Sequence, residues 1–205
     1  MVRFVTAGLA ALIAGGMLAG ANLEAQTNDG GLGMNRPGPP LNAAEARVLS
    51  GMSDATILGH LASVDSVEVA LSDTTIAKSK SDQVLAYAKM MRAAHLGSKH
   101  AVDVIAKETG IGRNTLAGEL RITHLFSMPD SVGNASEREI DRHYITEQIA
   151  IHRHVLAELQ LLQGVVKNQR AREHIDAAIP AVRDHLMRAV AIAKTRGFSW
   201  RRDVQ

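Results

Sequence analysis

Four long segments of this sequence repeat apolar residues in steps of three and four, which is the period of an amphipathic α-helix. They cover residues 54–78, 82–109, 136–166 and 169–196. A serine precedes the first two segments, and a glycine follows the second and the fourth. Serine is favoured at the start of a helix and glycine just after its end. The pattern therefore predicts an all-α fold built on four long helices.

The composition agrees with a helical domain. Only 3% of the 205 residues are aromatic, whereas the strands of β-sandwiches favour aromatic and β-branched residues. The length predicts one domain with a tail. The absence of cysteine excludes disulfides, cysteine-ligated zinc, iron–sulfur clusters and cysteine nucleophiles. A formal net charge of +2 gives no support for a nucleic-acid partner.

The spacing of the four segments predicts their connections. Short turns separate the first segment from the second and the third from the fourth, so each pair should form a helical hairpin. Residues 110–135 are rich in glycine and should form a long crossover, with one short helix around 116–126. Ser136 and Glu139 form a capping-box pattern at the start of the third helix. Two hairpins joined by a long crossover predict a four-helix bundle.

The N-terminus has the order of a secretory signal peptide: Arg3, an uncharged run over 4–21, and small residues at its end. We expect a signal peptide over residues 1–25, cleaved after Ala21 or Ala25. An uncleaved membrane anchor is the alternative, because the run is about as long as the ~18 residues of a short membrane span. Cleavage predicts an exported, periplasmic protein with no stable membrane span.

The rest of the chain divides by composition. Residues 26–52 are expected to form a Gly/Pro-rich linker with a short helix, because glycine and proline at this density disfavour regular structure. Residues 53–196 form the predicted bundle, and residues 197–205 form a C-terminal tail.

One ionisable residue interrupts the apolar stripe of each predicted helix: Glu68, His95, His152 and His185. Buried charged groups are costly unless they are paired or bind a metal ion. At 1.5 Å per residue, Glu68 and His95 lie about 18 and 22 Å from their hairpin turn, and His152 and His185 about 24 and 26 Å from theirs. All four side chains are therefore expected near the middle of the bundle, within reach of one metal ion.

A glutamate with three imidazoles suits Zn²⁺, Fe²⁺, Mn²⁺ or Cu²⁺, and it suits Mg²⁺ and Ca²⁺ poorly. It has too few carboxylates for a di-iron centre; Asp65 and Asp184 are the nearby acidic residues. The alternative is a buried hydrogen-bonded network of the same four side chains that binds nothing, since a Glu–His chain can satisfy its own hydrogen bonds.

These positions also carry a resemblance. The sequence resembles a ferritin-like family of exported bacterial proteins that is catalogued as a domain of unknown function and often labelled as membrane or outer-membrane proteins. The resemblance covers about residues 53–194. It depends on stretches in all four segments, of which the last is the most specific: Glu68-Val69-Ala70-Leu71, Tyr87-Ala88-Lys89-Met90-Met91 leading to His95, Tyr144 followed by His152, and Ile179-Pro180-Ala181-Val182-Arg183-Asp184-His185.

The resemblance implies a ferritin-like fold and no settled activity. Members often carry aspartate just before the second- and third-helix histidines, where this chain has Ala94 and Ile151. The departure removes two acidic residues that would orient the histidines.

Two functional hypotheses follow. In the first, the exported bundle binds a transition-metal ion through Glu68, His95, His152 and His185, for storage, buffering or limited redox chemistry. In the second, it is a non-catalytic interaction or stress protein of the cell envelope with an unknown protein partner. No catalytic motif is present, and no catalytic residue is assigned.

Two other features are interpreted as structural. His154 and Glu158, four residues apart, are expected to form a solvated pair on the helix surface. His60 falls outside the main apolar stripe.

Overall fold

Five α-helices make up most of residues 41–113 and 132–200, the part of the chain described by a computed structural model. All of these residues belong to one compact unit, residues 34–205. The helices are α1 (Ala43–Ser50), α2 (Asp54–Lys78), α3 (Asp82–Thr109), α5 (Ile140–Val165) and α6 (Gln169–Arg196). The described part of the chain is therefore all-α, as predicted.

The boundaries of α2, α3 and α6 are those that the sequence predicts. Ser53 accepts a hydrogen bond from a backbone N–H of the first turn of α2, and Asn168 does the same for α6. Gly110 and Gly197 follow α3 and α6 with φ angles of 68° and 65°. Glycine adopts this left-handed conformation without the steric cost that other residues meet.

The start of α5 differs from the prediction. Its first residue is Ile140, and Ser136 donates a hydrogen bond to the carboxylate of Glu139 rather than capping a backbone N–H. The backbone N–H of Glu139 bonds to the carbonyl of Ser136, so a tight turn precedes the helix. The predicted short helix at 116–126 and the predicted signal peptide at 1–25 lie outside the described residues.

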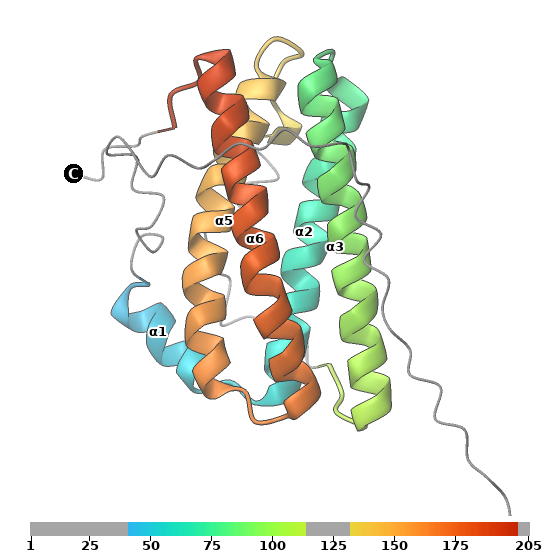
Figure 1. The fold of residues 1–205 in the computed structure, drawn as a ribbon, viewed down its shortest axis with the longest axis vertical. Coiled ribbons are helices and arrows are strands. Elements are labelled where there is room, and N and C mark those ends of the chain that lie inside the picture. The colour runs from blue at the N-terminus through green and yellow to red at the C-terminus, as the bar shows by residue number, and fades with distance from the viewer. Residues whose placement is uncertain (1–40, 114–131, 201–205) are drawn as a thin grey trace, which may run out of the picture. The chain divides into compact units, whose positions relative to one another are not determined.

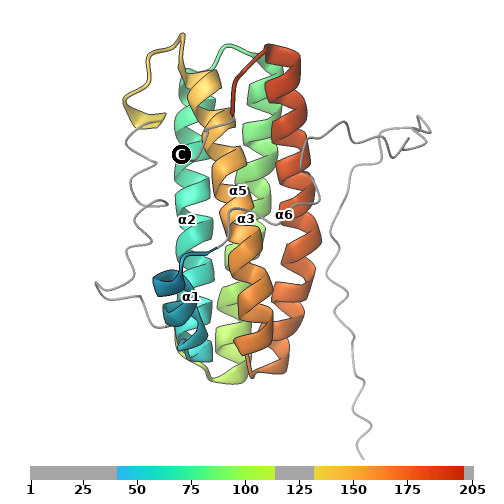
Figure 2. The same cartoon turned by 90° about the vertical axis from the view of Figure 1, so that its left-hand side faces the viewer.

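The four long helices lie side by side as two hairpins, α2 with α3 and α5 with α6 (Figure 1). Between the hairpins, α3 packs against α6 and α2 packs against α5. The short helix α1 packs on α5 near the end at which α2 begins, and the view in Figure 2 places it outside the long helices. The two predicted hairpins are therefore present.

The hydrophobic core follows the predicted stripes. Each long helix contributes fully or nearly fully buried aliphatic residues at helical spacing, and a buried residue of this kind contributes about 1.5–3 kcal/mol. Representative core residues are Ile57, Leu61, Val64 and Leu71 on α2, Val84, Met91 and Val102 on α3, Ile145, Leu159 and Leu162 on α5, and Ile175, Val182, Ala189 and Ile192 on α6.

The same core contains many polar side chains. The buried ionisable residues are His60, Asp65, Glu68, His95, Glu147, His152, Glu158 and His185. Neither lysine nor arginine is buried among the described residues.

Within this part of the chain, no helix has both the length and the apolarity needed to cross a membrane.

Candidate metal centre

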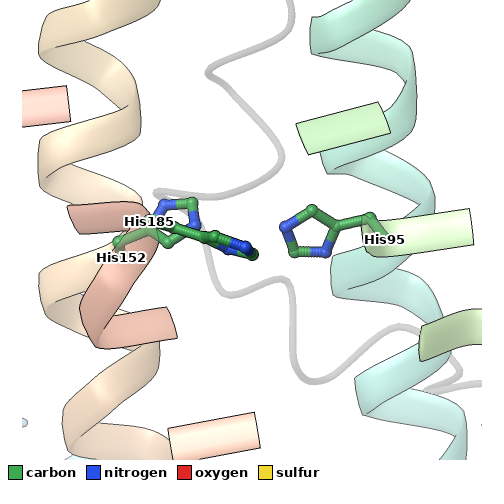
Figure 3. Close-up of side chains that lie close together, drawn as sticks. All are labelled: His95, His152 and His185. Carbon is green, nitrogen blue, oxygen red and sulfur yellow. The ribbon is translucent and has the colours of Figure 1, made fainter. Parts of the chain in front are cut away.

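Three histidines from three helices meet in the core between the two hairpins. His95 comes from α3, His152 from α5 and His185 from α6, each at a stripe position that an aliphatic residue would otherwise fill. Their ring centroids are 5.4–6.0 Å apart. One nitrogen of each ring lies within 4.8 Å of a nitrogen of each of the others. Figure 3 shows the three rings directed into the space between the helices.

Hydrogen bonds fix which nitrogens remain free. His152 Nδ1 lies 2.9 Å from the carbonyl oxygen of Gln148, and because a carbonyl only accepts, Nδ1 carries the proton and donates it. His95 Nδ1 lies 2.8 Å from Asp65 Oδ1. His95 Nε2, His152 Nε2 and His185 Nδ1 are buried without a hydrogen-bond partner. Three unpartnered imidazole nitrogens in one place are unusual in a folded core.

Glu68, the fourth residue that the sequence predicts for the site, lies beside the three histidines. It is 1% exposed, and its Oε2 accepts a hydrogen bond of 2.6 Å from Gln148 Nε2. Its Oε1 lies 3.8 Å from His152 Nδ1. Glu68 therefore approaches His152 at the nitrogen that bonds to the Gln148 carbonyl. The ligand atoms that lie within 4.8 Å of one another are those of the three histidines, and Glu68 is not part of that group.

Asp65 is the acidic partner of His95. It lies three residues before Glu68 on α2, and it reaches His95 across the α2–α3 interface. A carboxylate bonded to one ring nitrogen orients the imidazole and leaves the other nitrogen for a metal ion. Asp184, the other acidic residue near the site in sequence, is half-exposed and pairs with Arg188.

Burial and mutual repulsion keep two of the histidines neutral. Burial lowers the pKa of His152 well below its ordinary value, and the charges of His95 and His185 lower it further. Burial lowers the pKa of His185 to about 4, with a further contribution from His95. A metal ion binds the neutral form of imidazole, so these two rings need not lose a proton at neutral pH before they bind a metal ion.

The pKa values of His95 and Glu68 shift in the opposite direction. Burial alone would lower the pKa of His95, but the hydrogen bond to Asp65 and the charges of Glu68 and Asp65 outweigh burial and raise it. Burial raises the pKa of Glu68 despite the nearby His95 and the hydrogen bond from Gln148. Perturbed pKa values of buried, interacting groups gather at functional sites.

The two tyrosines of the chain lie next to the same polar layer. The hydroxyl of Tyr87 is 3.2 Å from the backbone carbonyl of His185, and that of Tyr144 is 3.0 Å from Ser72 Oγ. Their rings meet edge to face with centroids 6.0 Å apart. These contacts tie α3 to α6 and α2 to α5 beside the histidines, and so hold the helices that carry the site.

The donor set fits a transition-metal ion. Imidazole nitrogens bind Zn²⁺, Fe²⁺, Mn²⁺ and Cu²⁺, whereas Mg²⁺ and Ca²⁺ prefer sets of oxygen ligands. The residues that would hold the ion are His95, His152 and His185, each through one imidazole nitrogen.

A second buried cluster was not predicted. Glu158 on α5 is 2% exposed, and its two carboxylate oxygens each lie 3.3 Å from an imidazole Nε2, that of His60 on α2 and that of His154 on α5. The predicted pair of His154 and Glu158 is present, but the prediction that it is solvated is wrong because Glu158 is buried. His60 belongs to the core. The physical reason is that α1 and α2 both pack on α5, which widens its buried face beyond a single stripe.

The comparisons with known proteins give one match. A family model described as a domain of unknown function, DUF4142, matches residues 38–192. No curated protein and no solved structure matches the chain. The matched region runs from before α1 into the last turns of α6 and contains the three histidines.

Proposed function

The chain belongs to the DUF4142 family, a family of unknown function, and we propose that its helical domain binds one transition-metal ion through His95, His152 and His185. Two observations carry the proposal: one nitrogen of each of the three rings lies within 4.8 Å of a nitrogen of both others, and each ring has a buried nitrogen without a hydrogen-bond partner. An ion coordinated by all three would satisfy them together.

The proposed site lies between the hairpins, with His95 from one and His152 and His185 from the other. Two hairpins, a long connection and a site in the core between them are typical of ferritin-like bundles, and we assign this architecture to the domain as part of the proposal. With three imidazoles and few carboxylates, the site suits storage or buffering of a single ion, or limited redox chemistry, better than di-iron chemistry.

The proposed place of action is the periplasm. The support is the sequence of residues 1–25, which has the layout of a cleaved signal peptide. The intact mass of the protein purified from the cell envelope tests this directly: it should lack the first 21 or 25 residues, and a full-length mass would contradict export with cleavage.

The metal should stabilise the fold, because it joins the two hairpins and binds only when they are docked. Zn²⁺ at about 100 times its dissociation constant should add about 2.7 kcal/mol to the free energy of unfolding. For a domain of this size the midpoint of thermal unfolding should rise by about 5–10 °C. Circular dichroism during heating, with Zn²⁺ or with a chelator, measures the shift.

The same measurement separates the proposal from a purely structural role of the buried network. The hydrogen bonds of Asp65 with His95 and of Gln148 with Glu68 already join helices without an ion. If the network serves only the fold of an envelope interaction protein, Zn²⁺, Co²⁺, Cu²⁺ and Mn²⁺ should all leave the unfolding midpoint unchanged.

A further inference from the structure

Two buried carboxylates lie beside the three histidines. Asp65 and Glu68 are 5% and 1% exposed, and they stand one turn apart on α2. Asp65 Oδ1 is 2.8 Å from His95 Nδ1, and Glu68 Oε1 is 3.8 Å from His152 Nδ1. Asp65 Oδ2 and Glu68 Oε1 are buried without a hydrogen-bond partner. Each carboxylate is thus separated from the proposed ion by one imidazole ring.

In the part of the chain that the structure describes, no buried lysine or arginine balances these two acids. On the two helices that carry His95 and His185, Arg92 pairs with Asp73 and Arg188 with Asp184, and all four side chains are about half-exposed. Exposed pairs are screened by water and salt and compensate a buried charge weakly. Imidazoles bind a metal ion in their neutral form, so the three histidines add no charge of their own to the metal-bound site.

We propose that Asp65 and Glu68 select the charge of the bound ion, so that the site takes a divalent transition-metal ion in preference to monovalent Cu⁺ or Ag⁺. This inference depends on the metal site proposed above. Two carboxylates and a divalent ion form a neutral buried group, whereas a monovalent ion leaves one negative charge uncompensated. A buried net charge is costly.

Coulomb's law predicts how the loss of affinity depends on the charge of the ion. The attraction between a carboxylate and the ion is proportional to the charge of the ion. Removal of one carboxylate charge should therefore change the logarithm of the affinity twice as much for a divalent ion as for a monovalent ion. A carboxylate that only orients a ring should affect both ions by the same factor.

Asp65→Asn is the sharpest test, because asparagine keeps an oxygen that can accept the hydrogen bond from His95 while the charge is removed. Affinities for Zn²⁺ and Ag⁺ are measured by calorimetric titration in a nitrate buffer without chloride. We expect the Zn²⁺ affinity to fall about 10–100-fold, the usual size of the effect when a histidine ligand loses its acidic partner. Because asparagine keeps the orienting hydrogen bond, this loss comes from the charge, and the Ag⁺ affinity should fall by the square root of the same factor, about 3–10-fold. Glu68→Gln, which tests the second carboxylate independently, should show the same ratio.

Asp184→Asn is the matched control, because it removes an acidic residue adjacent to His185 that is exposed and paired at the surface. It should leave both affinities unchanged. The visible absorption bands of bound Co²⁺ should be the same in wild type and Asp65→Asn, which shows that the ligands are retained.

Equal losses for Zn²⁺ and Ag⁺ in both variants, or no loss, would overturn the charge selection while leaving the metal site intact. If the wild-type protein binds neither ion, the proposed function fails, and this inference fails with it.

Discussion

Replacement of His152 and His185 together by alanine should abolish the binding of Zn²⁺ and Co²⁺. The two substitutions remove two of the three nitrogens that face one another, and His95 alone is a weak ligand. Wild-type protein should bind about one ion per chain in equilibrium dialysis, and the double variant none. Circular dichroism must show that the variant keeps its helices, so that the loss is assigned to the site rather than to unfolding.

The matched control removes two histidines away from the site. His100 on α3 is exposed and His143 on α5 is partly exposed, and neither belongs to the buried cluster. The variant His100→Ala with His143→Ala should bind the same amount of metal as wild type. An unchanged stoichiometry in the His152/His185 variant, or an equal loss in both double variants, would contradict the assignment of the ligands.

Substitution of Glu158 by alanine should strongly destabilise the fold. Glu158 is the shared partner of His60 and His154, and it links α2 of one hairpin to α5 of the other. Breaking a buried ion pair by removing one partner typically costs about 3–5 kcal/mol. The midpoint of thermal unfolding should fall by about 6–20 °C, at about 2–4 °C per kcal/mol for a domain of this size.

Glu173 provides the control for this substitution. It lies on the surface of α6, where it pairs with Arg170, and both side chains are at least half-exposed. Exposed pairs contribute about 0–1 kcal/mol, so Glu173→Ala should shift the midpoint by a few degrees at most. A similar small effect of Glu158→Ala would mean that the buried cluster does not support the fold.

The contribution of Glu158 should also depend on pH. Burial alone would raise the pKa of Glu158, but its interactions with His154 and His60 outweigh burial and lower the pKa from 4.5 to about 2. The stability that this carboxylate provides is therefore present above pH 4.5 and lost as the pH falls toward 2. The hydrogen bond to Glu158 raises the pKa of His154 above 6.5, against burial, so its contribution is present below pH 6.5 and lost as the pH rises through the raised value.

Wild-type protein and Glu158→Gln should therefore differ most in unfolding free energy between about pH 4.5 and 6.5. Urea unfolding of both proteins at several pH values from 2 to 8 measures the difference. A difference that does not change between pH 2 and 8 would show that the carboxylate charge is not what stabilises the cluster.

The sequence predicted the helices well because helical periodicity and capping are local properties. Apolar steps of three and four located α2, α3 and α6, and serine, asparagine and glycine marked their ends. The start of α5 was missed by four residues, because the Ser136 hydroxyl bonds to the Glu139 side chain instead of the backbone. Which of these alternatives a serine adopts depends on the backbone of the preceding turn.

The candidate site was only partly predictable. The three histidines were found because a polar residue on an apolar stripe stands out in the sequence. The partnership of Asp65 with His95 joins two helices, and sequence spacing gives no rotation of one helix relative to another. The burial of the His154–Glu158 pair and its contact with His60 were missed, because α1 and α2 both pack on α5 and bury a second face of that helix. Periodicity along one helix does not reveal such a neighbour.

The metal content of the protein is the most direct test of the central claim. The mature protein should be purified without a histidine tag from cells grown with iron, zinc, manganese and copper, and measured by inductively coupled plasma mass spectrometry. We expect about one transition-metal ion per chain, lost in the variant that lacks His152 and His185. A well-folded wild-type protein that contains no metal, and takes up none when all four ions are supplied, would contradict the claim.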